Sequence, residues 1–154
     1  MSKPLDIVIL GLSITSSWGN GHATTFRALV RALSARGHNV CFLERDVPWY
    51  AEHRDMPNPP YGLTQLYKSV GELKRRFARK VMNADLCIVG SYVPDGVAIG
   101  DWVVRTCRGV TPSRNATELM SSSGSVAARA LIVSRSMSGP MRKSLRGRDI
   151  SSCA

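Results

Sequence analysis

Uninterrupted runs of apolar residues occur three times in the first 90 residues of the chain. They are Ile7–Leu10, Val40–Leu43 and Leu86–Val89. Four apolar residues in a row, with no polar residue between them, are typical of strands that are buried on both faces. We therefore predict three strands of a parallel sheet over these ranges.

A helical period follows the first of these runs. Phe26, Leu29, Val30 and Leu33 recur at intervals of three, one and three residues, which places one apolar stripe along a helix. This pattern predicts a helix over residues 22–36. Gly37 stands where a helix commonly ends, so we expect the C-terminal stop there.

A second helical period occupies residues 63–81, where Leu66, Val70 and Leu73 begin a series of apolar residues spaced by three or four. Ser69 and Glu72 form the pattern of a capping box, in which each residue satisfies a free backbone N–H group at a helix start. We therefore expect a short turn followed by a main helix over about residues 70–82.

A third helix is expected to start near Pro94 and Asp95, because proline has a suitable fixed φ and aspartate complements the helix dipole. We expect it to run to about Arg108 and to stop at Gly109. The apolar residues predicted to be buried by this helix are Val97, Trp102 and Val103.

The alternation of strands and helices defines the expected fold class. It predicts an α/β domain over residues 1–111, with a Rossmann-like parallel sheet and flanking helices, in the form of a partial doubly wound domain. A sheet of only three strands would leave one edge unprotected. We therefore expect self-association through that open edge.

The character of the sequence changes after Thr111. Residues 112–154 contain no Phe, Trp or Tyr, and eleven of these 43 residues are Ser. A segment with so little apolar surface cannot offset the entropy lost on ordering. We predict a basic, Ser/Arg-rich, poorly ordered tail in which only residues 127–133 form a short element. A natural tail and an out-of-frame translation product remain alternative origins for it.

Composition and charge limit the classes of function. The net charge is +10, of which residues 1–111 and 112–154 carry +5 each. The basic side of the helix over 70–82 has no interleaved aromatic residues, so a solvated helix face is favoured and nucleic acid is an unlikely partner. We see neither a signal peptide nor a run of about 20 apolar residues, which predicts a cytoplasmic protein without a membrane span.

Metal and nicotinamide chemistry are not expected. The four cysteines lie far apart without a C-x-x-C pair, and Cys41 and Cys87 fall in predicted buried strands, where cysteine acts as a small hydrophobic residue. The loop over residues 11–21 contains glycines but lacks the G-x-G-x-x-G pattern of dinucleotide-binding folds. The sequence therefore predicts no bound cofactor and no metal.

Candidate ligand-binding residues follow the predicted strands. Ligands bind open α/β sheets at the carboxyl ends of the strands, where Glu44, Arg45 and Asp46 form a charged group and Glu44 could accept a ribose hydroxyl. His22 begins the first helix beside two glycines, where it either contacts a phosphate, acts as a base, or has no chemical role. Trp49 and Tyr50 either stack on a sugar or cover the sheet, and we favour the second interpretation.

Three blocks of sequence together resemble a known family. They are Ile9–Thr25 (ILGLSITSSWGNGHATT), Leu43–Tyr50 (LERDVPWY) and Val89–Gly96 (VGSYVPDG). They resemble the amino-terminal half of bacterial glycosyltransferases of the two-Rossmann-domain (GT-B) type, and within these the CgeB-like, spore-maturation group. The resemblance covers about residues 5–111.

The resemblance implies an acceptor-side domain that forms one wall of the cleft, while a second domain binds most of the nucleotide-sugar. No donor domain fits in the remaining residues, so we expect a truncated enzyme that is inactive alone and binds a nucleotide-sugar or glycan acceptor once a donor domain is supplied. The residues implied to line the cleft are Gly19, Gly21, His22, Glu44, Arg45, Asp46, Ser91, Tyr92 and Asp95.

Two other functions stay open. One is a non-enzymatic basic binding module whose tail contacts nucleic acid or acidic surfaces. The other is a small nucleotide-binding α/β protein of a different kind. The sequence does not identify a catalytic residue for any of the three.

Overall fold

A central sheet with the strand order β3-β2-β1-β4-β5 organises the computed structural model, which describes residues 3–107 and 131–134. The strands are β1 (Asp6–Gly11), β2 (Asn39–Arg45), β3 (Leu63–Tyr67), β4 (Leu86–Val89) and β5 (Leu131–Ser134). The helices are α1 (His22–Ala35), α2 (Pro48–Ala51), α3 (Val70–Asn83) and α4 (Gly96–Thr106). Strands β1 to β4 are parallel, and the Rossmann-like α/β fold class is confirmed.

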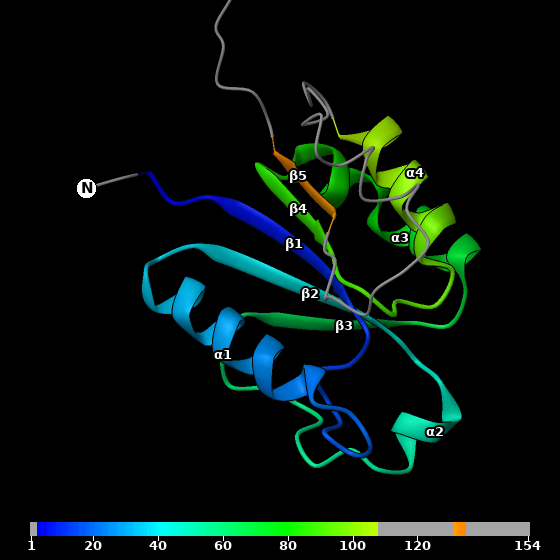
Figure 1. Ribbon diagram of the computed structural model, residues 1–154. Helices are drawn as coiled ribbons and strands as arrows, with labels where there is room; N and C mark the ends of the chain where they lie inside the picture. Colours follow the sequence, from blue (N-terminus) through cyan, green and yellow to red (C-terminus); the bar gives the residue numbers. More distant parts are fainter. Residues whose placement is uncertain (1–2, 108–130, 135–154) are drawn as a thin grey trace, which may run out of the picture.

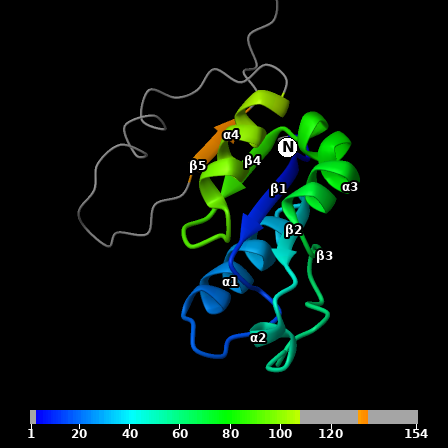
Figure 2. The ribbon, with the colours of Figure 1, turned by 90° about the vertical axis from the view of Figure 1, so that its right-hand side faces the viewer.

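The two central strands, β1 and β2, are buried on both faces, as their apolar runs predict. On one face, Ile7 and Ile9 pack with Phe42 against α1. On the other face, Val8 and Leu10 belong to a second cluster that includes residues of α3 and α4. Helix α1 therefore lies on one side of the sheet and α3 on the other (Figure 1, Figure 2).

The helix predictions for α1 and α3 are confirmed. Helix α1 ends at Ala35, and Gly37 follows with φ +84°. At the start of α3, the Ser69 hydroxyl accepts a hydrogen bond from the Glu72 backbone N–H at 3.2 Å. The Glu72 carboxylate accepts one from the Lys68 N–H at 2.7 Å, so the cap uses the two side chains that the sequence indicated.

Strand β3 corrects the prediction that the helical period starts at residue 63. Residues 63–67 form an edge strand parallel to β2, in the register Cys41↔Leu63. Only Tyr67 of this strand is fully buried, so the strand lacks the continuous apolar run that marks β1 and β2. The helical spacing that links Leu66 to Val70 crosses the boundary between the strand and α3.

Strand β5 corrects the prediction of a three-stranded sheet with an open edge beside β4. Residues 131–134 pair with β4 in the antiparallel direction (Figure 1). They overlap the short element expected over residues 127–133. The edge through which we expected self-association is thus paired within the chain. The predictions for Gly109 and for the rest of residues 112–154 lie outside the described residues.

Helix α4 buries Ile99, Gly100 and Val103, so the predicted burial of Val103 is confirmed. Trp102 is half-buried, whereas Val97 is 69% exposed, and its predicted burial is wrong. Val97 stands at the start of the helix and off the face that carries the buried residues. Within the described part of the chain, no helix combines the length and apolar character that crossing a membrane requires.

Candidate ligand-binding site at the carboxyl edge of the sheet

The strand order places a topological switch point at the carboxyl end of β1. The chain runs outward from β1 through β2 to β3, and then crosses back so that β4 lies on the other side of β1. The loop after β1 leads to α1 on one face of the sheet, and the turn after β4 leads to α4 on the other face. The two segments therefore start beside each other and then diverge. Ligands of open α/β folds bind at such a position, which agrees with the edge that the sequence indicated.

The loop after β1 is held by a buried carboxylate. Glu44, at 0% exposure, accepts hydrogen bonds from the backbone N–H groups of Ile14 at 2.7 Å and Thr15 at 3.0 Å. It also accepts hydrogen bonds from the hydroxyls of Thr15 at 2.7 Å and Ser13 at 3.2 Å. Glu44 therefore fixes the loop and is not placed to accept a ribose hydroxyl, which corrects the expectation that it faces a ligand.

Two strand-end glycines bring α1 close to the switch point. A Cβ atom on Gly90 would lie 2.8 Å from Cζ of Phe26, and one on Gly11 would lie 2.2 Å from Cζ of Phe42. Both distances are far shorter than a van der Waals contact. Phe26 and Phe42 pack edge-to-face in this space, with ring centroids 5.0 Å apart. Helix α1 can therefore start directly beside the ends of β1 and β4.

His22 and Tyr92 meet at this position. The rings of His22, at the start of α1, and Tyr92, in the turn after β4, have centroids 5.2 Å apart. Tyr92 is 60% exposed. Tyr92 and Asp95 adopt φ values of +63° and +59°, which are uncommon for residues other than glycine. Backbone strain of this kind is concentrated at functional sites, so it supports a ligand-binding role for the turn.

An ion pair spans the switch point. Arg45, at the end of β2, donates a hydrogen bond from its guanidinium to the carboxylate of Asp95, in the turn after β4. Because β1 lies between β2 and β4, this pair crosses the carboxyl end of β1. Asp46 is held in another way, since its carboxylate accepts a hydrogen bond from Arg54 at 2.6 Å.

Three aromatic rings, two of them exposed, form a second group on this edge, between the loop before α1 and the segment around α2. Trp18 packs edge-to-face on Trp49, with ring centroids 4.6 Å apart, and stacks on His53 at 4.3 Å. Trp18 and Trp49 are 46% and 57% exposed. The interpretation that Trp49 covers the sheet is therefore wrong, because α2 buries none of its residues.

A bidentate ion pair fixes the segment that carries these rings. The Asp55 carboxylate accepts hydrogen bonds from both terminal nitrogens of Arg27, at 2.8 and 2.9 Å, and from the N–H and hydroxyl of Ser17, both at 2.9 Å. The Arg27 guanidinium holds the pKa of Asp55 well below its usual range. The segment after β2 is thereby tied to the loop after β1 and to α1.

The remaining predicted residues are placed as follows. Gly19 has φ +64°, whereas Gly21 has an ordinary helical conformation and its Cβ position faces open space. Ser91 is half-buried in the turn after β4. The structure thus pairs His22 with Tyr92 and Arg45 with Asp95 at one edge.

Sequence reasoning missed two residues of the edge, Trp18 and His53. A tryptophan within a Gly/Ser-rich loop is a signal that could have revealed Trp18.

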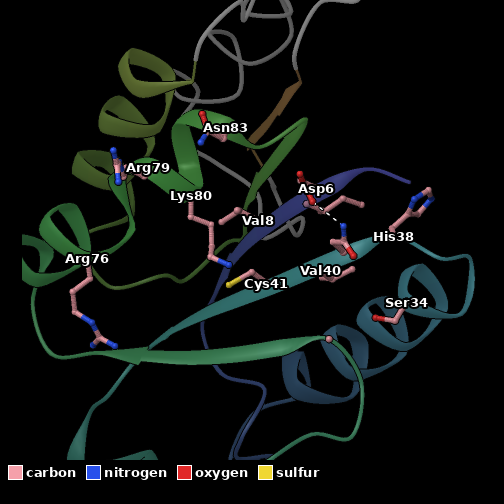
Figure 3. Close-up of a pocket in the computed structure, with 13 residues that line it drawn as sticks. Asp6, Val8, Ser34, His38, Val40, Cys41, Arg76, Arg79, Lys80 and Asn83 are labelled. Atoms are coloured by element: carbon pink, nitrogen blue, oxygen red, sulfur yellow. Dashed lines mark hydrogen bonds between the residues drawn. The ribbon is translucent and has the colours of Figure 1, made fainter. Parts of the chain in front are cut away.

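A pocket of about 700 Å³ lies at the opposite, amino edge of the sheet, beside the start of β2 and Gly62, the residue before β3. Figure 3 shows Lys80 reaching from α3 towards Cys41 on β2. The C-terminal ends of α1 and α3 point to this edge, and Lys80 in the last turn of α3 offsets the negative end of the helix dipole. Arg76, also on the pocket wall, is bonded to Glu72 at 2.6 Å. Ligands of open α/β folds bind at the opposite edge, at the carboxyl ends of the strands, so we place the candidate site there.

No group of three or more His, Cys, Asp or Glu side chains that could hold a metal ion occurs among residues 3–107 and 131–134. Comparisons with protein-family models, curated proteins and solved structures give no match.

Proposed function

We propose that this chain is the acceptor-side domain of a glycosyltransferase of the two-Rossmann-domain type, and that the carboxyl edge of its sheet binds a saccharide. The observation that carries the proposal is the exposed pair of Trp18 and Trp49 on that edge. An exposed indole offers a flat apolar surface against which the C–H groups of a sugar ring can pack. A contiguous exposed apolar surface commonly marks an interaction site.

Hydroxyl groups of a bound sugar need hydrogen-bonding partners around that apolar surface. The turn after β4 offers the hydroxyls of Ser91 and Tyr92, and the start of α1 offers the imidazole of His22. These hydrogen-bonding groups lie on the same edge as the tryptophans. An apolar surface together with a few polar groups is the combination expected of a small-molecule site.

The resemblance described above supports the same proposal. Each of its three blocks spans the carboxyl end of a different strand: Ile9–Thr25 follows β1, Leu43–Tyr50 follows β2, and Val89–Gly96 follows β4. The residues that carry the resemblance are therefore those that form the candidate site. In this proposal the sugar donor is a nucleotide-sugar, and transfer to the acceptor hydroxyl requires a donor-binding domain.

The proposal is tested by saccharide binding to the full chain. Methyl glycosides of glucose, galactose, mannose and N-acetylglucosamine are titrated while the indole N–H signals of the tryptophans are followed by NMR. We expect the signals of Trp18 and Trp49 to shift and that of Trp102, on α4, to stay fixed. Trp49→Ala is expected to weaken binding by about tenfold.

Tyr50→Ala is the matched control, because Tyr50 neighbours Trp49 on α2 but belongs to none of the ring pairs on the edge. Gly21→Val provides a second probe. Its side chain would enter open space at the start of α1, so it should obstruct a ligand without disturbing the fold. The proposal is abandoned if none of the glycosides shifts the Trp18 and Trp49 signals, or if Trp49→Ala and Tyr50→Ala weaken binding equally.

A further inference from the structure

The charged side chains of the candidate site are paired with one another. Arg45 is paired with Asp95, Arg54 with Asp46, and Arg27 with Asp55. The carboxylate of Glu44 is buried and accepts four hydrogen bonds from the loop after β1. Among the described residues, the groups that this edge leaves for a ligand are the side chains of Ser91, Tyr92, His22, Trp18 and Trp49.

The pair of Arg45 and Asp95 stands out because of its position. Its side chains are 27% and 49% exposed, so a ligand at the switch point would touch both. Arg45 is also close to where His22 and Tyr92 meet, since Asp95 belongs to the same short turn as Tyr92. Without Asp95, the guanidinium of Arg45 would be free to form a bidentate contact with a carboxylate or phosphate.

We propose that the ion pair of Arg45 and Asp95 determines the charge of the ligand, so that the site takes a neutral saccharide and rejects sugars that carry a carboxylate. Asp95 occupies the guanidinium of Arg45 and adds its own negative charge beside the ligand. This inference rests on the proposed function, and it adds to it the class of saccharide and the residues that select it.

Among the described residues, the start of α1 is a feature of the edge that favours an anion. Its N-terminus carries about half a positive elementary charge, and no acidic residue lies in its first turn. One of its free N–H groups, that of Ala23, already donates to the side chain of Asn20 at 3.0 Å. Asp95 already occupies the guanidinium of Arg45, so a carboxylate at this edge would face only this partial charge, which does not offset the cost of removing the carboxylate from water.

The experiment compares matched neutral and acidic sugars on the full chain. The probes are methyl glucoside with methyl glucuronide, and methyl galactoside with methyl galacturonide, each followed by the indole signals of Trp18 and Trp49. The wild-type chain is expected to bind the neutral member of each pair more tightly. Asp95→Asn is expected to tighten binding of the uronides by about tenfold, while glucoside binding changes by less than about threefold.

Asparagine suits this position because it tolerates the left-handed backbone that Asp95 adopts. Asp101→Asn, on α4, is the matched control, since it removes the same charge from an exposed residue whose nearest cation lies 3.8 Å away. A double variant, Asp95→Asn with Arg45→Gln, is expected to lose the gain in uronide binding. That loss would show that the gain comes from the freed guanidinium and not from lower negative charge in general.

The outcomes separate the two proposals. If the wild-type chain binds uronides as well as neutral glycosides, or if Asp95→Asn gives no gain, the charge selection is refuted while saccharide binding stands. The same holds if Asp101→Asn produces an equal gain. If no glycoside or uronide shifts the tryptophan signals in any variant, the proposed function fails and this inference fails with it.

Discussion

Thr15 is bound to Glu44 twice, through its backbone N–H at 3.0 Å and through its hydroxyl at 2.7 Å. Glu44 lies on the central strand β2 and is fully buried, so these bonds are shielded from water. A buried carboxylate must be hydrogen-bonded on all sides to be tolerated. The loop after β1, which carries Trp18, is therefore positioned from inside the sheet.

The first prediction is that Glu44→Gln destabilises the fold by about 2–3 kcal/mol. The two backbone N–H groups share one carboxylate oxygen, which the amide oxygen of glutamine can replace. The NH₂ group then faces the hydroxyls of Thr15 and Ser13 and cannot accept their hydrogen bonds, so these charge-assisted bonds are lost. Urea unfolding at neutral pH measures the change. Glu52→Gln, at an exposed position, is the control and should change stability by less than about 0.5 kcal/mol. Equal effects of the two variants would show that Glu44 does not hold the loop.

The second prediction concerns Asp55, whose pKa is lowered chiefly by its hydrogen bonds with Arg27. A carboxyl group whose pKa is lower in the folded state stabilises that state above its unfolded pKa of about 3.9. The contribution is lost as the pH falls through the folded pKa. Because Asp55 is 48% exposed, we expect Asp55→Asn to lose about 1 kcal/mol or less at neutral pH.

Urea unfolding of both proteins at neutral pH and at about pH 3 measures this dependence. The difference between the wild-type chain and Asp55→Asn should shrink at the lower pH, and added salt should reduce it at neutral pH. Asp101→Asn should show a small difference at either pH. A difference for Asp55→Asn that grows on acidification would contradict the assigned direction of the pKa shift.

The parts of the fold that sequence patterns predict are those where burial alone determines the structure. Strands β1, β2 and β4 and helices α1 and α3 each carry a pattern that matches their burial. Strand β3 lies at the edge of the sheet and buries only Tyr67 fully, so it has no apolar run of its own. Its apolar residues are therefore assigned to the helical pattern that follows. Strand β5 lies in a segment poor in apolar residues, and its pairing with β4 is a tertiary contact that no local pattern encodes.

The candidate site was predictable in position but not in the roles of its residues. The carboxyl ends of parallel strands meet at one edge, which placed Arg45, Tyr92 and Asp95 together. A charged residue at the end of a strand is normally expected to be exposed. Glu44 is buried instead, because it bonds to donors that lie more than 25 residues away in the sequence. Likewise, whether Trp49 faces solvent depends on how the segment after β2 returns to the sheet.

The third prediction is that the buried cysteines react slowly in the folded protein. Cys41, Cys87 and Cys107 are 5%, 1% and 8% exposed, and the sulfur atoms of Cys87 and Cys107 lie 3.3 Å apart. The hydrogen bond with Cys107, together with burial, raises the pKa of Cys87, and burial raises that of Cys41. The reactive thiolate is therefore scarce at these positions.

Iodoacetamide labelling at neutral pH, followed by mass spectrometry of tryptic peptides, measures the reactivity of each cysteine. We expect slow labelling of all three in the folded chain and fast labelling in urea. Among the three, Cys107 should react first because it is the most exposed. Rapid labelling of Cys87 without urea would show that β4 is accessible to solvent.

The fourth prediction is that Gly90→Ala destabilises the protein by about 1–3 kcal/mol. The added Cβ would lie 2.8 Å from Cζ of Phe26 and 3.4 Å from the carbonyl oxygen of Leu10, so the Phe26 ring, which is packed against Phe42, or α1 itself would have to shift. Gly21→Ala is the matched control, because a Cβ at that position meets no atom within 4 Å. Thermal unfolding followed by circular dichroism compares the two variants.

Replacing Phe26 distinguishes a local clash from a general intolerance of Gly90 to substitution. Phe26→Leu alone removes part of the ring cluster with Phe42 and should also destabilise the fold. In the double variant, leucine lacks the ring atoms that the new Cβ would meet, so we expect less destabilisation than the sum of the two single changes. Additive effects would show that Gly90 is required for a reason other than its contact with α1, and the close approach of α1 to the strand ends would then not depend on this glycine.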